Sequence, residues 1–272
     1  MRVTFPVYVQ LFNHGVHPHF VLEVLAYTGG FQLYRLTRRQ RARALGAAAV
    51  LPFEQNLWLI VGCIFGALAG SKLLAWAESI DQYWPAMRGG DPRVWLGGKT
   101  IVGGLLGGWI GVEIAKWRLG VTGSTGDQFV FPLIFGMSVG RVGCFLTGLD
   151  DHTYGVATSF PWGVDFGDGV RRHPTQLYDI AVLLALGSLF LLRMRKPWRN
   201  GRMFRWFMLG YLGWRFLAEF IKPREIRVPW LNLSAIQIAS LAGVIVCAWL
   251  LLLSAASPPR SVIETGVTHE MA

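Results

Sequence analysis

The stretch Gly140-Arg141-Val142-Gly143-Cys144-Phe145 places an arginine inside an otherwise apolar, glycine-rich segment of the chain. The run Arg172-His173-Pro174-Thr175-Gln176-Leu177-Tyr178-Asp179 opens the next apolar segment. A guanidinium in hydrocarbon costs at least about 2.5–3.5 kcal/mol, so a chain tolerates one where it meets an anion. Bilayers supply such anions as lipid phosphates. These stretches therefore predict a membrane protein that binds a phospholipid headgroup.

The composition also points to a bilayer. Of 272 residues, 53% are hydrophobic and 15% are charged, with a mean hydropathy of +0.40, whereas soluble domains carry about 25% charged residues. The net charge is +10, but the basic clusters at 35–43 and 193–205 directly follow apolar stretches, as topology determinants do. No nucleic-acid-binding motif accompanies the charge, so we expect no nucleic-acid partner. The three cysteines form no disulfide framework or Cys-x-x-Cys metal pattern.

Apolar stretches of about twenty residues recur along the chain and predict an all-α integral membrane protein, a bundle of about seven transmembrane helices. The predicted spans are 19–36, 57–79, 94–118, 127–149, 175–193, 203–221 and 233–254. The distribution of lysine and arginine places the amino terminus outside and the carboxyl terminus in the cytoplasm. Residues 1–257 then form one transmembrane domain with an outer loop at 150–172, and 258–272 form a disordered cytoplasmic tail.

Two arginines lie inside predicted spans, Arg141 in the fourth and Arg215 in the sixth. Arg215 and Glu219 are four residues apart, so they share a helix face and can pair. Arg141 has no acidic residue at helical spacing within its own span. We expect its counter-charge to come from a ligand or from one of four acidic residues, namely Glu23, Glu219, Asp150 and Asp151. The planar fork of an arginine suits two phosphate oxygens.

Other polar residues gather where the fifth span begins, at the outer side. His173 can move protons near neutral pH or can merely cap the turn, and the sequence leaves both readings open. Gln176 and Tyr178 add hydrogen-bonding groups, although Tyr178 also fits an interfacial anchor. The cluster Asp150-Asp151-His152 is better explained by a solvated loop than by a metal site, so no metal is predicted.

The ordered motifs resemble the prolipoprotein diacylglyceryl transferase family over nearly the whole chain. The resemblance rests on five motifs: Gly97-Gly98 with Gly103-Gly104-Leu105; Gly140-Arg141-x-Gly143-x-Phe145-x-x-Gly148; Tyr154-Gly155; Arg172-His173-Pro174-Thr175-Gln176-Leu177-Tyr178; and Gly210-Tyr211-x-x-x-Arg215-x-x-x-Glu219-Phe220. The chain departs from the family where Val102 replaces a histidine and Cys144 an asparagine. Glu23 stands where the first span of the family has a tyrosine.

The resemblance implies a multi-pass enzyme of the bacterial inner membrane that needs no cofactor. Such an enzyme transfers the diacylglyceryl group of phosphatidylglycerol to the lipobox cysteine of a secreted lipoprotein precursor, forming a thioether and releasing glycerol phosphate. The implied catalytic residues are Arg141, Arg215, Glu219 and His173. The implied substrate-binding residues are Arg141, Gly143, Cys144, Gly104, Gln176, Tyr178 and Glu23. Glu23, His152 or His173 is expected to take the proton of the acceptor thiol.

Two other functions stay open from the sequence. Val102 and Cys144 alter the half of the site that meets the nucleophile, so the chain can be a paralogue that passes a group from phosphatidylglycerol to a different acceptor. A non-catalytic lipid-binding or transport protein of the same fold is the third reading. Release of glycerol phosphate, with or without labelling of a lipobox peptide, separates them.

Overall fold

The computed structural model describes residues 5–11, 14–45, 51–193, 201–223 and 232–256, and these are mainly helical. The long helices are α1 (Pro18–Leu45), α2 (Phe53–Glu78), α5 (Ile101–Leu119), α6 (Val130–Thr147), α7 (Thr175–Arg193), α8 (Arg202–Ala218) and α9 (Ala235–Ala256). Each overlaps one predicted span. The expectation of an all-α membrane protein is confirmed, whereas the predicted tail at 258–272 lies outside the described residues.

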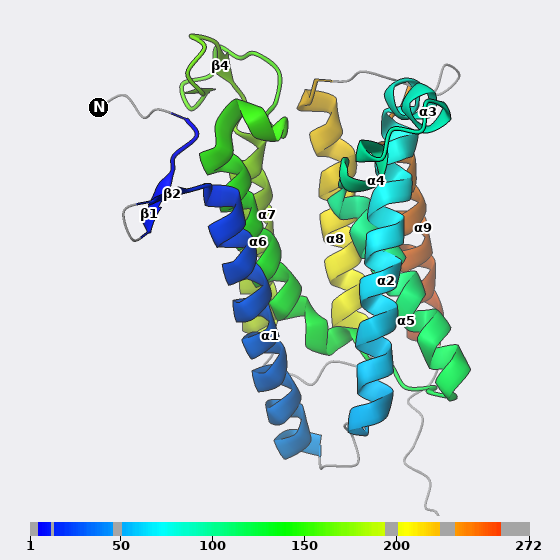
Figure 1. Cartoon of the computed structure of the whole chain (residues 1–272). Helices are drawn as coiled ribbons and strands as arrows, with labels where there is room; N and C mark the ends of the chain where they lie inside the picture. The colour runs from blue at the N-terminus through cyan, green and yellow to red at the C-terminus, as the bar shows by residue number, and fades with distance from the viewer. Residues whose placement is uncertain (1–4, 12–13, 46–50, 194–200, 224–231, 257–272) are drawn as a thin grey trace, which may run out of the picture.

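The helices run roughly parallel and alternate in direction (Figure 1). We call the end that carries β4 and α3 in Figure 1 the upper end, and the opposite one the lower end. α1 packs against α6, α6 against α7, α7 against α8, and α8 against α9. α9 also contacts α2 and α5, which pack against each other. The shorter helices are α3 (Ile80–Arg88), α4 (Arg93–Leu96), η2 (Gly126–Phe129), η3 (Gly148–Asp151) and η4 (Glu219–Ile221). Strand β1 (Val9–Leu11) pairs antiparallel with β2 (His14–Val16), and β3 (Val164–Asp165) pairs antiparallel with β4 (Arg171–Arg172).

Two predicted spans differ from the observed helices for identifiable reasons. α1 continues nine residues beyond the predicted end at 36, because arginine is a good helix former that sustains the helix after the apolar stretch ends. The third predicted span began too early. Its first residues form the separate short helix α4, and α5 begins only at Ile101, since glycine at positions 97 and 98 weakens a continuous helix.

Within the part of the chain that the structure describes, four helical segments are long and apolar enough to cross a membrane: Phe53–Glu78, Gly126–Asp151, Thr175–Arg193 and Ala235–Ser254. Large apolar side chains point outward from several helices, among them Phe65 (70% exposed) and Leu192 (74% exposed). A water-facing surface would not carry so many, so they form a lipid-facing surface. The chain is therefore a multi-pass membrane protein.

α2 and α5 pack through glycines on both helices. A methyl group on Gly66 would lie 2.2 Å from the backbone oxygen of Gly107, and one on Gly107 would lie 2.2 Å from that of Gly66. Gly70 and Gly103 face each other in the same way, at 2.4 and 2.3 Å. Only glycine allows this backbone approach, which replaces the hydrophobic driving force that helices lack in lipid. The two helices thus behave as one unit.

We predict that Gly107→Ala lowers the free energy of unfolding by about 1–3 kcal/mol, because the added methyl group collides with backbone that cannot move away. Gly213→Ala in α8 is the matched control, since no atom lies within 4 Å of its added methyl group. Thermal unfolding in detergent, followed by tryptophan fluorescence, measures both. Equal midpoints for the two variants would contradict the close α2–α5 packing.

Candidate active site

Three charged side chains from three helices meet near the upper end of the bundle. Arg141 of α6 contacts Asp179 of α7, with 2.7 Å between Nε and Oδ2. Arg215 of α8 reaches the same carboxylate, with 3.4 Å between Nη1 and Oδ2. All three lie one to two turns from the upper ends of their helices, and their side chains are at most 5% exposed. Asp179 therefore joins both arginines in one buried site.

The ionic site extends upward along α8. Arg215 also donates to Glu219 through Nη2, so the pairing predicted from their four-residue spacing is observed. Lys222 follows, with 3.8 Å between its Nζ and Oε1 of Glu219. The indole of Trp214 donates to Oδ1 of Asp179 at 2.5 Å. We call Arg141, Asp179, Arg215, Glu219 and Lys222 the arginine cluster.

The four acidic residues expected as the counter-charge of Arg141 were wrong, because within the described residues it pairs with Asp179. Neither Glu23, Asp150 nor Asp151 pairs with it, and Glu219 pairs with Arg215 and Lys222 instead. Asp179 was missed although it lies inside an apolar span, the very property that singled out Arg141. A carboxylate buried in a span needs a partner for the same energetic reason as an arginine does, so the signal was present in the sequence.

Several buried polar atoms around the arginine cluster have no hydrogen-bond partner within the described residues. They include both amide atoms of Gln176 and Nε of Arg215. Tyr211 lies one turn before Arg215 on α8 and within the electrostatic range of Arg141 and Asp179. Gln176 lies one turn before Asp179 on α7. Buried polar groups rarely stay unsatisfied, so this concentration of donors and acceptors suits a polar ligand.

His173 and Tyr178 form a separate polar group above α7. Nδ1 of His173 lies 3.1 Å from the Tyr178 hydroxyl, which accepts a hydrogen bond from the Trp162 indole at 2.8 Å. The chain at Gly155 and Val156 links this group to the end of η4. Gly155 N–H donates to the His173 carbonyl at 2.8 Å, and Val156 N–H donates to that of Ile221 at 2.9 Å. His173 thus stands at the upper rim of the arginine cluster without contacting it.

An ion pair joins Arg172 and Asp168 in the loop at 150–172. Two guanidinium nitrogens of Arg172 donate to the two carboxylate oxygens of Asp168, each at 2.7 Å. These hydrogen bonds lower the pKa of Asp168 to about 2, so the carboxylate keeps its charge throughout the physiological range. The pair closes the turn between β3 and β4, which lies beside the entrance to α7.

A second polar group lies where α1 packs against α6. A methyl group on Gly143 would lie 3.4 Å from the His19 backbone, so glycine lets the two helices approach. Glu23 lies one turn below His19, with 3.9 Å between the His19 ring and the Glu23 carboxylate. Cys144 is 9% exposed and lies near His19 and Asp151. Glu23, Gly143 and Cys144 were predicted as substrate-binding residues, whereas His19 was predicted only as the first residue of a span.

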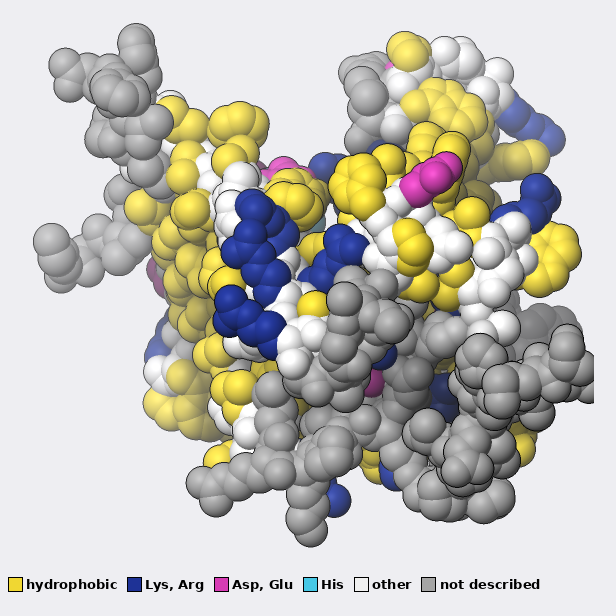
Figure 2. All heavy atoms as spheres, turned by 90° about the horizontal axis from the view of Figure 1, so that it is seen from below, with side chains coloured by type: hydrophobic (Ala, Val, Ile, Leu, Met, Phe, Trp, Pro, Cys, Tyr) yellow, Lys and Arg dark blue, Asp and Glu magenta, His cyan; other side chains and the backbone are white. Residues whose placement is uncertain are grey.

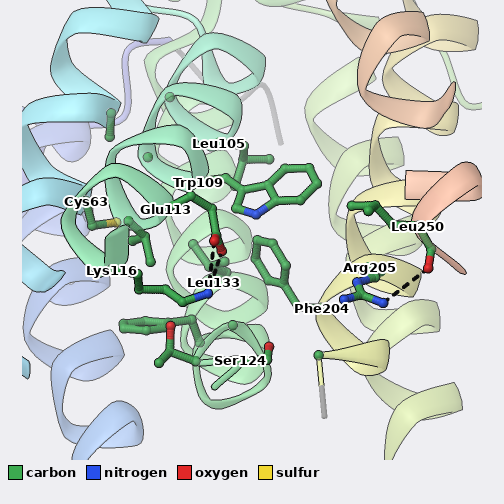
Figure 3. Close-up of a pocket in the computed structure, with 18 of the residues that line it drawn as sticks. Cys63, Leu105, Trp109, Glu113, Lys116, Ser124, Leu133, Phe204, Arg205 and Leu250 are labelled. Carbon is green, nitrogen blue, oxygen red and sulfur yellow. Dashed lines mark hydrogen bonds and ion pairs between the residues drawn. The ribbon is translucent and has the colours of Figure 1, made fainter. Parts of the chain in front are cut away.

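Gly104 lies apart from the arginine cluster, in the wall of a cavity of about 540 Å³. Figure 3 shows this cavity between α5 and α8, with the rings of Trp109 and Phe204 in edge-to-face contact in its wall and the Lys116–Glu113 pair below. Most of its lining is apolar. Its wall includes Met137, one helical turn before Arg141, but also Ser124 and Arg205 near the lower end, so the cavity lies below the arginine cluster.

A family model for prolipoprotein diacylglyceryl transferase matches residues 6–253. The chain belongs to the prolipoprotein diacylglyceryl transferase family. Three similar proteins carry the name phosphatidylglycerol–prolipoprotein diacylglyceryl transferase. The one from Glaesserella parasuis is 31% identical over 82% of each chain. The one from Cupriavidus necator is 31% identical over 83% of this chain and 86% of its own. The one from Bordetella parapertussis is 31% identical over 87% and 91%.

Family membership confirms the resemblance drawn from the motifs and makes this chain a diacylglyceryl transferase. The two departures from the family pattern have different structural outcomes. Val102 is 1% exposed and packs in the hydrophobic core with Leu212 and Met208, so its position contributes no polar atom to the site. Cys144, in contrast, lies on α6 one turn beyond Arg141 and adds a thiol beside the arginine cluster.

We predict that Asp179→Ala lowers the free energy of unfolding by about 3–5 kcal/mol, because two buried guanidinium groups lose a shared counter-charge. Asp168→Ala, which removes the exposed partner of Arg172, is the control and should leave the unfolding midpoint nearly unchanged. Denaturant unfolding in detergent measures both variants. Equal losses in the two would contradict a central role of Asp179.

Lys222 gives the arginine cluster a pH dependence. Burial first, and then the charge of Arg215, lowers the pKa of Lys222 from 10.5 to about 8. Between these two values the unfolded chain binds more protons than the folded one, so stability rises with pH in this window. We predict a rise in the unfolding midpoint from pH 8 to 10.5 that Lys222→Met abolishes. The same rise in both proteins would contradict the lowered pKa.

Proposed function

We propose that this chain transfers the diacylglyceryl group of phosphatidylglycerol to the thiol of the lipobox cysteine in a lipoprotein precursor, releasing glycerol phosphate. The names of its relatives support the donor and the acceptor. The observation that carries the proposal is the pair of arginines, Arg141 and Arg215, that share the buried carboxylate of Asp179. This arrangement suits a charged headgroup attached to two acyl chains.

The arginine cluster has the charge for a phosphate diester. Among its five groups, Arg141, Arg215 and Lys222 are positive while Asp179 and Glu219 are negative, so one positive charge remains for a monoanion. Arg141 approaches Asp179 most closely through Nε, and we assign its two terminal nitrogens to the phosphate oxygens. Gln176 supplies further hydrogen bonds from amide atoms that have no partner within the described residues.

The chemical step follows from that placement. The thiolate sulfur attacks the glyceryl carbon, the new C–S bond forms, and the C–O bond to the phosphate breaks. The departing phosphate takes the electron pair, and its charge grows next to Arg141 and Arg215, which are already in place and require no reorganisation. Asp179 and Glu219 hold the two guanidinium groups in position. His173, at the rim, accepts the thiol proton; Glu23 and His152 remain the alternatives.

The cavity gives the acyl chains a place below the headgroup. Gly104 and Gly108 leave part of its wall without side chains, and Leu105, Leu133 and Met137 provide apolar contact. A lipid seated there would place its phosphate toward the arginine cluster, because Met137 precedes Arg141 by one turn. Gly104 then binds substrate through the acyl chains rather than through the headgroup.

The charge of the lower face indicates the orientation. Seen from below, lysine and arginine side chains spread over this face, whereas few acidic ones are visible (Figure 2). The basic side chains that the structure describes at this end include Arg38, Arg39, Arg41, Arg118, Arg202 and Arg205. Basic residues favour the cytoplasmic side. We therefore assign seven spans in the bacterial inner membrane, with the lower end and carboxyl terminus cytoplasmic and the amino terminus and arginine cluster outside.

We predict that Arg141→Lys lowers the transfer rate by about 10²–10³-fold, because lysine loses the two-nitrogen fork that stabilises the departing phosphate. Arg118→Lys, at the exposed lower end of α5, is the matched control. Purified protein is incubated with phosphatidylglycerol labelled in the acyl chains and a lipobox peptide, and peptide labelling is followed.

The outcomes separate the three functions. Labelled peptide that depends on Arg141 supports the transferase. Arginine-dependent release of glycerol phosphate without peptide labelling identifies a different acceptor, a reading that Cys144 favours because it alters the acceptor half of the site. Lipid binding with no release of glycerol phosphate would overturn catalysis.

A further inference from the structure

Three potential metal ligands from separate parts of the chain meet at the upper end of α6. They are His19 near the start of α1, Cys144 in α6 and Asp151 at the end of η3. One ligand atom of each lies within 4.8 Å of the others. Nδ1 of His19 is 3.8 Å from Oδ1 of Asp151. Nδ1 is also buried and has no hydrogen-bond partner within the described residues, so the ring points a ligand atom into this group.

The donor set is that of a zinc site with an open position. Imidazole, thiolate and carboxylate are the ordinary zinc ligands, and catalytic zinc sites use three protein ligands with a fourth position left for water or substrate. Sulfur disfavours magnesium and calcium. Bond lengths of about 2.0–2.3 Å place tetrahedral zinc ligands roughly 3.3–3.8 Å apart, so small side-chain rotations bring the group to that spacing.

Outer contacts orient two of the three ligands. The other ring nitrogen of His19, Nε2, lies 3.9 Å from Oε2 of Glu23, and Glu23 in turn accepts from the Tyr27 hydroxyl at 3.1 Å. Thr153 donates to Oδ2 of Asp151 at 2.5 Å. A carboxylate behind the ligating histidine and a donor on the ligating carboxylate are the usual second layer of protein metal sites.

This group lies beside the arginine cluster. Cys144 follows Arg141 by three residues and therefore shares its side of α6. A cation held by Cys144 would stand next to the position assigned to the lipid phosphate. The cysteine occupies the position where the family has an asparagine, so the site is a property of this chain rather than of the family pattern.

We propose that His19, Cys144 and Asp151 bind a thiophilic divalent cation such as Zn²⁺, whose fourth position binds the thiolate of the acceptor cysteine. The second half rests on the proposed transferase function. The acceptor thiol gives its proton to His173, the base assigned above, as its sulfur binds the cation. The sulfur then leaves the cation and forms the C–S bond, the C–O bond to phosphate breaks, and the departing phosphate takes the electron pair. No metal was predicted from the sequence, where the cluster Asp150-Asp151-His152 was explained as a solvated loop. That cluster shares only Asp151 with the present site, and its other two residues are exposed.

Cobalt(II) tests the site without relying on activity, because a bound thiolate gives a charge-transfer absorption in the near ultraviolet. Metal-free protein in detergent is titrated with Co²⁺, and zinc content after dialysis is measured in parallel. We expect one cation per chain and a thiolate band that Cys144→Ser removes. His19→Ala should weaken binding by more than tenfold, and Glu23→Gln by about 10–100-fold, as for other outer ligand partners.

Matched controls keep this test specific. Cys63→Ala removes a free cysteine elsewhere in the bundle, and His152→Ala removes the neighbouring exposed histidine; both should bind Co²⁺ as the parent protein does. Absence of stoichiometric binding by the parent protein would overturn the site even if some variants fail to fold. Binding that survives Cys144→Ser and His19→Ala would overturn it as well.

The acceptor role is tested separately. Adding a lipobox peptide to the Co²⁺ protein should strengthen the thiolate band, while the same peptide with serine in place of cysteine should not. An unchanged band would overturn the thiolate position yet leave the metal site standing. Loss of lipid transfer with intact metal and peptide binding would instead contradict the proposed function.

Discussion

The carboxylate of Asp179 is the group on which the upper half of this protein depends. It pairs with the guanidinium groups of Arg141 and Arg215 and accepts a hydrogen bond from the indole of Trp214. These contacts join α6, α7 and α8 at one level. Charges in a low-dielectric interior are stable only as mutually compensating sets. Arg141 and Arg215 are therefore held where a phosphate can meet both. The same contacts that stabilise the helices prepare the site for an anion.

In the proposed function, the arginine cluster and the apolar cavity divide the recognition of one amphiphile. The cluster provides charge and directed hydrogen bonds, whereas the cavity below it provides space lined by apolar groups and glycines. The α2–α5 pair forms one wall of this cavity, and its glycine contacts make that wall rigid. Headgroup chemistry and acyl-chain binding are thus supported by different packing principles in neighbouring helices.

Much of the fold could be predicted from the sequence because apolar length is a local property. Each long helix of the described residues overlaps a predicted apolar stretch. The errors fall at helix ends such as that of α1, where the helix continues through polar residues that a hydropathy pattern does not assign to a span. The Arg215–Glu219 pair was predictable from a spacing of four residues. Asp179 was not found as the partner of Arg141, because that pairing joins two helices and leaves no spacing in the sequence.

The grouping of His19, Cys144 and Asp151 has the same origin. Each residue taken alone has an ordinary explanation as a helix start, a small buried residue or a loop acid. Only the close packing of α1 on α6, which Gly143 permits, brings them together. Local motifs therefore identified the family, while the features particular to this chain required the helix arrangement.

The sharing of one carboxylate by two arginines also restricts how the protein can change over evolutionary time. Replacing any one of the three leaves an excess buried charge on the other two, at a cost comparable to a large part of a domain's net stability. A single substitution among the three is therefore expected to cost more stability than one at a neighbouring position such as Cys144, which forms no ion pair within the described residues.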